Sequence, residues 1–360
     1  MPSVSIALAT YNGEKYIGEQ LDSLAAQTLR PAELVVCDEA SSDGTVAAVE
    51  AFATTAPFPV HITRNPERLG YRRNFMKAAG VCQGELIAFC DQDDIWHPEK
   101  LRVMAAFFAD PGMMLASHNA RLVDADGKPF GQIRDYEHAT QVFEAMAFTP
   151  WAFPQGFTMV FRRELLVLSP LQHLSLDYTF VGEMLAHDQW IYLLATIFGR
   201  IANVADLLAD YRQHGSNLYG IAHKPKTRRD RWNEKFEKFS NFRHYADACD
   251  RIVQILDAAA QLPLPDDFPH RRTAAAARFR ELAELYRRRG IAYAAASPVE
   301  RLRGWLALAR AGGYGKHQAW SFGRKELVRD FVLGVCLGKL RRRTGNEPTR
   351  DWSLSVNRPV

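Results

Sequence analysis

Three carboxylates, Asp91, Asp93 and Asp94, stand directly after an apolar run, Leu86 to Cys90. Such a run is typical of a buried strand in a parallel sheet, and ligands in open α/β sheets collect just beyond the carboxyl ends of strands. Carboxylates crowded there repel one another unless a cation sits among them. Mg²⁺ and Mn²⁺ favour oxygen ligands and often share their coordination with a substrate's phosphates. The stretch therefore predicts a divalent-metal site; the alternative is a polar loop that caps the helix expected after Pro98.

Polar residues also follow two earlier apolar runs. Val4 to Ala9 is followed by Thr10-Tyr11-Asn12-Gly13, and Leu34 to Cys37 is followed by Asp38. If these runs are neighbouring strands, their polar ends line one crevice together with Asp91.

The spacing of the elements favours this arrangement. Apolar runs at Val4–Ala9, Leu34–Cys37, Val60–Thr63 and Leu86–Cys90 alternate with amphipathic helical patterns. That order predicts βαβ units and a mostly parallel sheet, hence an α/β fold. The first strand-to-helix turn carries neither G-x-G-x-x-G nor the P-loop pattern, so the common dinucleotide and P-loop fingerprints are absent.

The rest of the front half continues the alternation. We expect helices at Glu99–Phe108 and Glu183–Phe198, strands at Met113–Ser117, Phe157–Phe161 and Leu207–Tyr211, and a turn at 124–127. Residues 131–155 are rich in aromatic side chains and typical of a binding loop. From Ile221 the texture changes to basic helical patterns, expected at Arg228–Gln254, Arg271–Arg289, Val299–Ala311 and Lys325–Arg343.

Charge divides the 360 residues into two parts. Residues 221–360 hold 29 Lys and Arg against 15 Asp and Glu, whereas residues 1–220 hold 16 against 26. A basic segment of this kind favours a polyanionic partner, and no nucleic-acid-binding motif accompanies it. We therefore expect no nucleic acid but a peripheral membrane contact, made by Arg271/Arg272, Arg287–Arg289 and Arg341–Arg343 beside Leu302, Trp305, Leu306 and Leu308. A helical bundle that only braces the front half is the alternative.

Other features bear on the compartment. Apolar stretches stay shorter than the roughly 20 residues of a membrane span, and Met1-Pro-Ser-Val-Ser is unlike a signal peptide. The five cysteines form no C-x-x-C pair. We expect a cytoplasmic protein without disulfides or a zinc site. We expect its contact with the inner face of the cytoplasmic membrane to be peripheral.

Five motifs, in order, resemble the family 2 glycosyltransferases with the GT-A fold, particularly the rhamnosyltransferase-like members of bacteria. They are Ala9-Thr-Tyr-Asn-Gly, Val36-Cys-Asp-Glu-Ala-Ser-Ser-Asp-Gly-Thr45, Asp91-Gln-Asp-Asp-Ile-Trp96, His187-Asp-Gln-Trp190 and Tyr211-Arg-Gln-His-Gly-Ser-Asn217. The resemblance covers about residues 3–220 and implies a GT-A catalytic domain at 1–220, followed by a helical basic region at 221–360. It departs from the family at Glu39-Ala40, where Asp-Gly is usual.

The resemblance implies a role for each motif residue. Asp38 would accept the N3–H of uracil or thymine, Asp91 would hold the ribose, and Asp93 would bind Mg²⁺ or Mn²⁺ with help from His214. The remaining donor-binding positions would be Thr10, Tyr11, Asn12, Glu14, Asn74 and Gln92. Arg212 would assist the diphosphate, and Trp96 and Trp190 would either stack on sugars or pack in the core.

Asp188 is the predicted catalytic base. An acceptor hydroxyl is a weak nucleophile near neutral pH, so a carboxylate must take its proton during attack. Attack opposite the leaving group inverts the anomeric centre. The implied reaction moves rhamnose or a similar sugar from a dTDP or UDP donor to a bacterial surface glycan or lipid-linked glycan.

Two other functions fit parts of the sequence. A nucleotidyltransferase also combines an α/β sheet with paired carboxylates, but it would need a Gly-rich basic loop, and Thr10–Gly13 is not one. A non-catalytic module that binds sugar nucleotides is the third hypothesis, against which Asp188 speaks.

Overall fold

The computed structural model describes residues 1–134, 139–147, 151, 153–180, 182–215, 242–315 and 320–337. The chain forms two compact units. The first comprises Met1–Phe148, Phe153–Pro170 and Leu185–Gly220, and the second comprises Thr149–Ala152, Leu171–Met184 and Ile221–Val360. The predicted boundary at 220/221 lies outside the described residues. Two short segments of the front half thus belong to the second unit.

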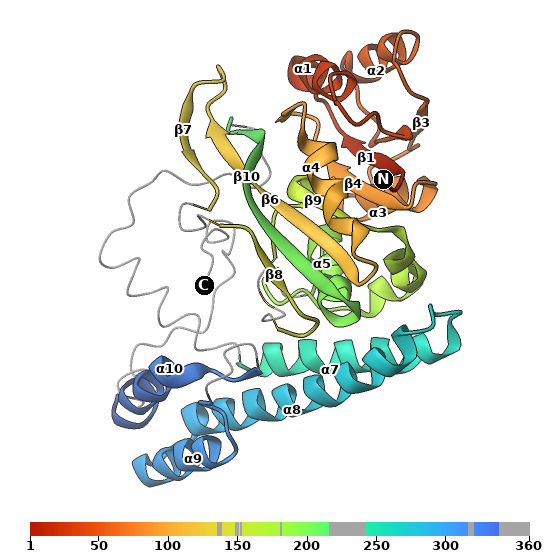
Figure 1. Cartoon of the computed structure of the whole chain (residues 1–360). Helices are drawn as coiled ribbons and strands as arrows, with labels where there is room; N and C mark the ends of the chain where they lie inside the picture. The colour runs from red at the N-terminus through yellow and green to blue at the C-terminus, as the bar shows by residue number, and fades with distance from the viewer. Residues whose placement is uncertain are drawn as a thin grey trace. The chain divides into compact units, whose positions relative to one another are not determined.

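Four parallel strands form one half of a ten-stranded sheet (Figure 1). They are β1 (Val4–Thr10), β2 (Glu33–Asp38), β3 (Val60–Arg64) and β4 (Leu86–Cys90), in the order β3-β2-β1-β4. Every residue of β2 and β4 is buried, which explains their unbroken apolar runs. Helices α1 (Glu14–Ala25), α2 (Thr45–Ala53) and α3 (Tyr71–Val81) connect them. These four predicted strands are confirmed.

The other half of the sheet is mixed. Strand β9 (Met159–Arg162) lies antiparallel between β4 and β6 (Met113–Val123), and β10 (Arg200–Arg212) runs parallel to β6. The short strands β5 (Ile95–Trp96), β7 (Pro129–Gln132) and β8 (Gln141–Phe143) pair antiparallel with β10, β6 and β10 respectively. The predicted strand Leu207–Tyr211 is only the end of β10.

Two helical segments also differ from the prediction. Helix α4 (Lys100–Ala106) gives way to a 3₁₀ turn, Phe107–Ala109, and α5 spans His187–Phe198 rather than starting at Glu183. The backbone N–H of Ala186 donates to Oε1 of Gln189 at 2.7 Å, which fixes the start of α5. His187 and Asp188 consequently stand in its first turn. Further 3₁₀ turns occupy Gly156–Thr158 and Arg163–Leu174.

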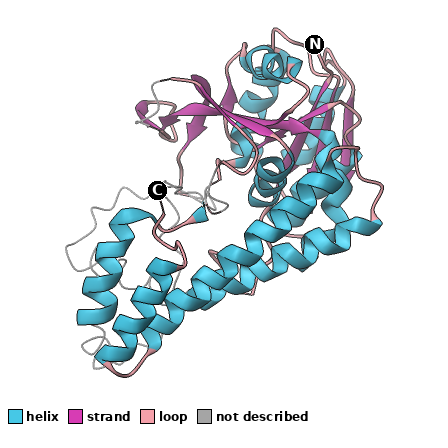
Figure 2. Cartoon of the chain, turned by 60° about the horizontal axis from the view of Figure 1, so that its bottom comes forward, coloured by secondary structure: helices cyan, strands magenta, loops and turns pink. Residues whose placement is uncertain are grey.

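The second unit is helical where it is described. It contains α7 (Phe242–Ala258), α8 (Phe268–Ala294), α9 (Pro298–Arg310), α10 (Gly323–Asp330) and a π-helical turn, η6 (Phe331–Cys336), with a 3₁₀ turn at Ala259–Gln261. Helices α7 and α8 lie side by side in both views (Figures 1 and 2). Among the described residues, no helix has the length and apolar character to cross a membrane.

Candidate active site

The acidic loop after β4 meets the end of β10. Oδ2 of Asp93 lies 2.8 Å from Nε2 of His214. The His214 ring stacks on Tyr16 with centroids 4.7 Å apart, and the Arg212 guanidinium lies 4.8 Å from the same tyrosine ring. Residues predicted as a metal pair from positions 121 apart in the chain are therefore adjacent in the fold.

Arg212 ties the loop to the strand. Its backbone N–H donates to Oδ1 of Asp94 at 3.2 Å, and its Nε donates to the carbonyl of Asp93 at 3.2 Å. Its Nη1 reaches the carbonyl of Ala125, and its Nη2 bonds Glu19. Through these hydrogen bonds Arg212 holds the acidic loop after β4 against the end of β10. The sequence predicted contact with the diphosphate and not this structural role.

Burial and mutual repulsion dominate the electrostatics of the acidic loop. Burial raises the pKa of Asp91 to about 8, with Asp93 and Asp188 adding to the rise and Lys100 opposing it. Burial raises the pKa of Asp94 well above its usual range as well, again with Asp93 and Asp91 contributing. Asp91 and Asp188, from different elements, are thus close enough to interact. Removing these charges from water is unfavourable without a compensating cation.

Lys100 supplies part of that compensation. Its side chain is fully buried, its Nζ donates to the carbonyl of Phe157 at 2.7 Å, and Nζ lies 3.3 Å from the centre of the Trp96 ring. Burial lowers the pKa of this ammonium to about 7, although Cys90, Asp94 and Asp91 oppose the shift. Sequence reasoning missed Lys100; the signal was a lysine starting a helix just after three carboxylates.

Asp38 lies at the end of β2, in register with Thr10 of β1. Its Oδ1 accepts from the Thr10 hydroxyl at 2.8 Å and from the Ser41 hydroxyl at 2.5 Å, while Oδ2 accepts the Ser41 backbone N–H at 2.8 Å. These bonds fix the carboxylate, and each oxygen can accept more than one hydrogen bond. Ala40 has φ 57°, so the turn adopts the left-handed conformation that glycine would favour.

Tyr11 and Gln92 are joined by two hydrogen bonds. The Gln92 amide accepts from Tyr11 N–H at 2.8 Å and donates to Tyr11 carbonyl at 3.0 Å. The Gln92 side chain thereby continues the hydrogen bonding between β1 and β4 past the ends of the two strands. The Arg68 guanidinium lies 3.8 Å from the centre of the Tyr11 ring, which adds a cation that sequence reasoning missed.

Asn12 and Glu14 bind the turn after β2. Asn12 has φ 45°; its N–H donates to the Ser41 hydroxyl and its Oδ1 accepts Ser42 N–H, both at 2.9 Å. Oε2 of Glu14 accepts Gly44 N–H at 3.0 Å. In this structure both side chains join the turn after β1 to the turn after β2.

Asn74 and the two predicted tryptophans lie in the core. Asn74 is 1% exposed, and its amide donates to the Cys37 carbonyl and accepts from Asn65, both at 2.8 Å. This amide braces β2 from helix α3 here. Trp96 and Trp190 are 1% and 0% exposed, so both pack in the core.

Asp188 is presented by the first turn of α5. The preceding His187 is buried, stacked on Phe75 with centroids 3.9 Å apart, and meets Phe89 edge-on at 4.8 Å. Burial, with a smaller effect of Arg72, lowers the pKa of His187 to about 3, so the imidazole is neutral. His187 therefore anchors the turn, while Asp188 remains partly exposed.

The residues present could hold a divalent cation whose remaining ligands come from a bound substrate and water. Among the described residues, no three His, Cys, Asp or Glu side chains are grouped to hold a metal. Asp93 and His214 offer two ligands, and Oδ2 of Asp94 is buried without a hydrogen-bond partner. Mg²⁺ and Mn²⁺ sites commonly use one or two protein ligands and take the rest from substrate phosphates and water.

Comparison with known proteins covers part of the region that holds this site. Residues 5–167 match the family described as glycosyl transferase family 2. An uncharacterized glycosyltransferase of Nostoc sp. is 25% identical over 221 residues, 59% of this chain and 66% of the relative. The dTDP-rhamnosyl transferase RfbG of Shigella flexneri is 33% identical over 99 residues, 26% of this chain and 34% of the relative. The chain thus spans less than two thirds of the length of these curated relatives.

A solved structure shares the fold. Residues 1–349 of S. aureus TarS, in complex with UDP-GlcNAc, superpose with a TM-score of 0.52 and 17% identity, covering 97% of this chain and 94% of that one. At this identity the likeness concerns the fold alone. It confirms the predicted α/β fold of the GT-A type, and the family match confirms the resemblance over residues 5–167, which hold the first three of the five motifs.

Proposed function

We propose that the protein transfers a sugar from a nucleotide-diphosphate donor to a hydroxyl of a bacterial surface glycan, because residues 5–167 match the family described as glycosyl transferase family 2. One observation carries the proposal. Polar groups from β1, β2, the loop after β4, α5 and β10 meet beyond the carboxyl ends of the strands, and Asp188 is near enough to Asp91 to contribute to its raised pKa. We assign catalysis to residues 1–220.

The crevice beyond β1 and β2 is the proposed nucleotide site. Asp38 is fixed by Thr10 and Ser41 and retains acceptor capacity for the imide N3–H of uracil or thymine. Asp91 would hold the ribose, Tyr11, Asn12, Glu14 and Gln92 would shape the pocket, and Asn74 would brace strand β2. The name of RfbG supports dTDP-rhamnose as the first donor to test, with UDP-hexoses second.

Asp93 and His214 are the proposed protein ligands of Mg²⁺ or Mn²⁺. Such a cation supplies positive charge that stabilises the departing diphosphate. The chain's own part is to hold the two ligands in place, since His214 stacks on Tyr16 and the loop backbone is bonded to Arg212.

Asp188 is the proposed general base. The acceptor oxygen attacks the anomeric carbon, its proton passes to the Asp188 carboxylate, and the bond to the diphosphate breaks on the opposite face. A single displacement of this kind inverts the anomeric configuration. The buried ring of His187 holds the turn that presents the carboxylate.

We place the reaction on the cytoplasmic side, with the C-terminal helices in peripheral contact with the membrane that carries a lipid-linked acceptor. The basic balance of residues 221–360 supports this placement. This placement determines how the enzyme reaches its acceptor. It is independent of the proposed binding and cleavage of the donor.

Calorimetric titration with dTDP-, UDP- and GDP-sugars, with and without Mn²⁺, tests the donor proposal. We expect one nucleotide class to bind, and only with metal, followed by metal-dependent release of the nucleoside diphosphate when acceptor glycan is added. Binding without turnover on any acceptor would favour a non-catalytic module. Pyrophosphate release from a nucleoside triphosphate and a sugar phosphate would instead identify a nucleotidyltransferase.

A further inference from the structure

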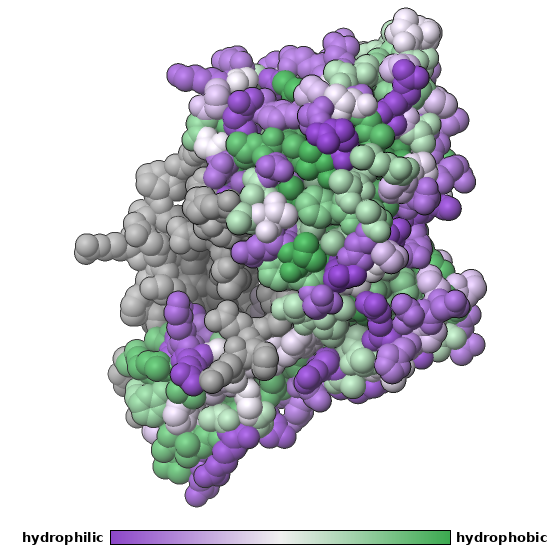
Figure 3. All heavy atoms as spheres, in the orientation of Figure 1, coloured by the Kyte–Doolittle hydropathy of each residue, from purple (hydrophilic) through white to green (hydrophobic). Residues whose placement is uncertain are grey.

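Two neighbouring helices of the second unit expose apolar side chains. Helix α9 exposes Val299, Leu302 and Leu306, spaced at helical intervals, and α10 with η6 exposes Val328, Phe331 and Val332. Figure 3 shows apolar side chains gathered over these helices, at the lower left of the view. We call these six residues the α9/α10 face. Exposed apolar side chains that recur on one side of a helix mark an interaction surface.

The two halves of this face adjoin. The Trp305 ring of α9 contacts the Phe331 ring with centroids 5.2 Å apart, and Trp305 Nε1 donates to the Leu327 carbonyl at 3.0 Å. Helix α9 also packs against η6. The apolar stripes of both helices therefore form one surface.

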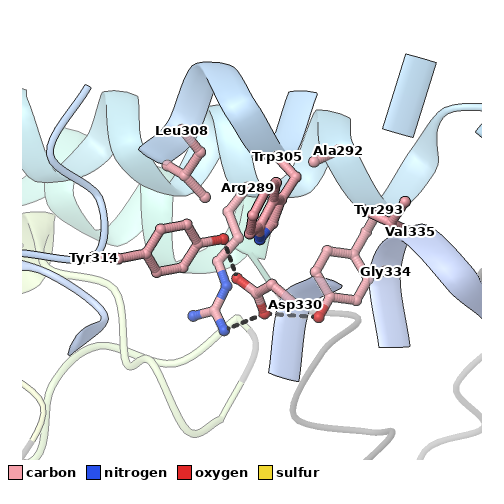
Figure 4. A pocket seen from close by; sticks show the side chains of 9 residues that line it. All are labelled: Arg289, Ala292, Tyr293, Trp305, Leu308, Tyr314, Asp330, Gly334 and Val335. Carbon is pink, nitrogen blue, oxygen red and sulfur yellow. Dashed lines mark hydrogen bonds and ion pairs between the residues drawn. The ribbon is translucent and has the colours of Figure 1, made fainter. Parts of the chain in front are cut away.

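A buried ion cluster braces the helices behind the face (Figure 4). Asp330 is 2% exposed; its Oδ1 accepts from Arg289 and from the Tyr293 hydroxyl, both at 2.7 Å, and its Oδ2 accepts from the Tyr314 hydroxyl at 2.8 Å. Arg289 also bonds Glu326 at 2.5 Å. These bonds join α8 to α10 around the small pocket, so the cluster positions α10 against α8.

The charges around the face have one dominant sign. The exposed charged residues of α9 and α10 are Arg303, Arg310, Arg324, Lys325 and Arg329, against Glu300. Glu326 is paired with Arg289 and with Arg329, so the excess of positive charge over Glu300 comes from Arg303, Arg310, Arg324 and Lys325. An apolar stripe fringed by arginine and lysine is the pattern of helices that lie in the interface of an anionic membrane.

We propose that the α9/α10 face is the membrane-docking surface, with its six apolar side chains at the boundary of headgroups and acyl chains and its basic fringe on anionic lipid phosphates. The proposal deepens the peripheral contact proposed above by naming the surface. It also corrects the residues predicted for it. Leu308 is buried, Arg289 belongs to the ion cluster, and Arg287 and Arg288 pair with Asp250 and Glu284. Arg341–Arg343 lie outside the described residues.

The test is co-sedimentation of the full chain with vesicles of phosphatidylcholine alone, or of phosphatidylcholine mixed with phosphatidylglycerol. We expect binding to the mixed vesicles only, weakened by salt.

Leu306→Gln with Val332→Gln should lower partitioning about tenfold or more, because two apolar side chains no longer leave water. Arg303→Gln with Arg324→Gln should lower it by roughly fivefold for each charge. Val81→Gln, at an exposed valine of α3, is the matched control and should bind as the wild type.

Circular dichroism and donor titration of each variant establish that the fold and the donor site are intact. A wild type that stays in the supernatant with mixed vesicles at low salt overturns the proposal. So does a glutamine double variant that binds as the wild type. If the same variant instead abolishes self-association in sedimentation equilibrium and vesicles are not bound, the face joins two copies of the chain. Vesicle binding without glycosyl transfer would contradict the proposed function and leave the docking surface standing.

Discussion

Asp188 presents its carboxylate from a turn whose other residues are buried. Because only removal of the acceptor proton depends on its charge, Asp188→Asn should keep donor affinity and lower the transfer rate about 10²- to 10⁴-fold. The measurement is the dissociation constant of the donor beside kcat for transfer. Asp206→Asn, at an exposed carboxylate of β10, is the control and should leave both unchanged. Turnover close to the wild type in the Asp188 variant would place the base elsewhere.

Asp93 and His214 should act together in metal-dependent donor binding. Asp93→Ala and His214→Ala each remove one of the two proposed ligands, so titration with donor should lose its dependence on Mn²⁺. His61→Ala removes an exposed histidine from β3 and serves as control. Wild-type donor affinity that is indifferent to metal would contradict the proposed cation.

The residue types of this site could be predicted, but several of their partners could not. Asp93 and His214 were expected as a pair because both stand in recognisable motifs. Lys100, Tyr16 and Arg68 were missed because their relevance arises from contacts: a buried carbonyl for Lys100, a stacked imidazole for Tyr16 and a neighbouring ring for Arg68. Asn74 was expected to contact the nucleotide. In the structure its amide, on helix α3, instead donates to the Cys37 carbonyl of β2.

Among the elements, continuous apolar strands were the easiest to predict. Strands β1, β2 and β4 are buried on both faces, so their composition alone marks them. The first part of β10 was missed because its register with β6 shifts at Val204/Leu207 and Leu207/Asp210. Such irregularities break the alternation on which strand prediction depends. The start of α5 depends on one side-chain hydrogen bond, which periodicity does not reveal.

Asp210 joins three elements of the sheet. Arg121 of β6 donates to both of its oxygens at 2.8 and 2.7 Å, and Nε2 of His97, just after β5, lies 3.1 Å from Oδ1. Although burial would raise the pKa of Asp210, hydrogen bonds from His97 and Arg121 lower it to about 2. Asp210→Asn should therefore lower the free energy of unfolding by about 1.5–3 kcal/mol near neutral pH.

The same carboxylate should give a defined pH dependence. Its pKa is lower in the folded chain than the value of about 3.9 expected when unfolded, so its stabilisation is present above pH 4 and is lost as the pH falls towards 2. Urea unfolding of wild type and Asp210→Asn across this window measures the effect. The two curves should converge at the acidic end; a constant difference would exclude the ionised pair as its source. Asp206→Asn again provides the control.

At the scale of the whole molecule, the chain has two compact units with separate means of stabilisation. The first is organised by the sheet, and the second by packed helices and the Arg289–Asp330 cluster. The helical character of the back half was predicted from periodicity. Its inclusion of residues 171–184 was not, because contacts between distant segments, such as Nε2 of His244 with the Asp177 carbonyl at 2.7 Å, leave no periodic signal.

Asp330→Ala should destabilise the second unit by about 3–5 kcal/mol, because Arg289 would keep a buried charge with one partner fewer. Differential scanning calorimetry with the donor nucleotide separates the units, since donor should raise only the transition of the first. Asp257→Ala, at an exposed ion pair of α7, should have little effect. A shift of the donor-sensitive transition in the Asp330 variant would contradict independent stabilisation of the units.

The double hydrogen bond between Gln92 and the backbone of Tyr11 restricts which residues can stand beside it. A β-carbon at Gly13 would overlap the Gln92 amide, so a glutamine at 92 excludes every side chain at 13 unless the amide moves away. The two positions are separated by almost eighty residues, yet position 13 can gain a side chain only after, or together with, a change at position 92. Among chains that build this loop in the same way, those with glutamine at the second position should keep glycine at the first.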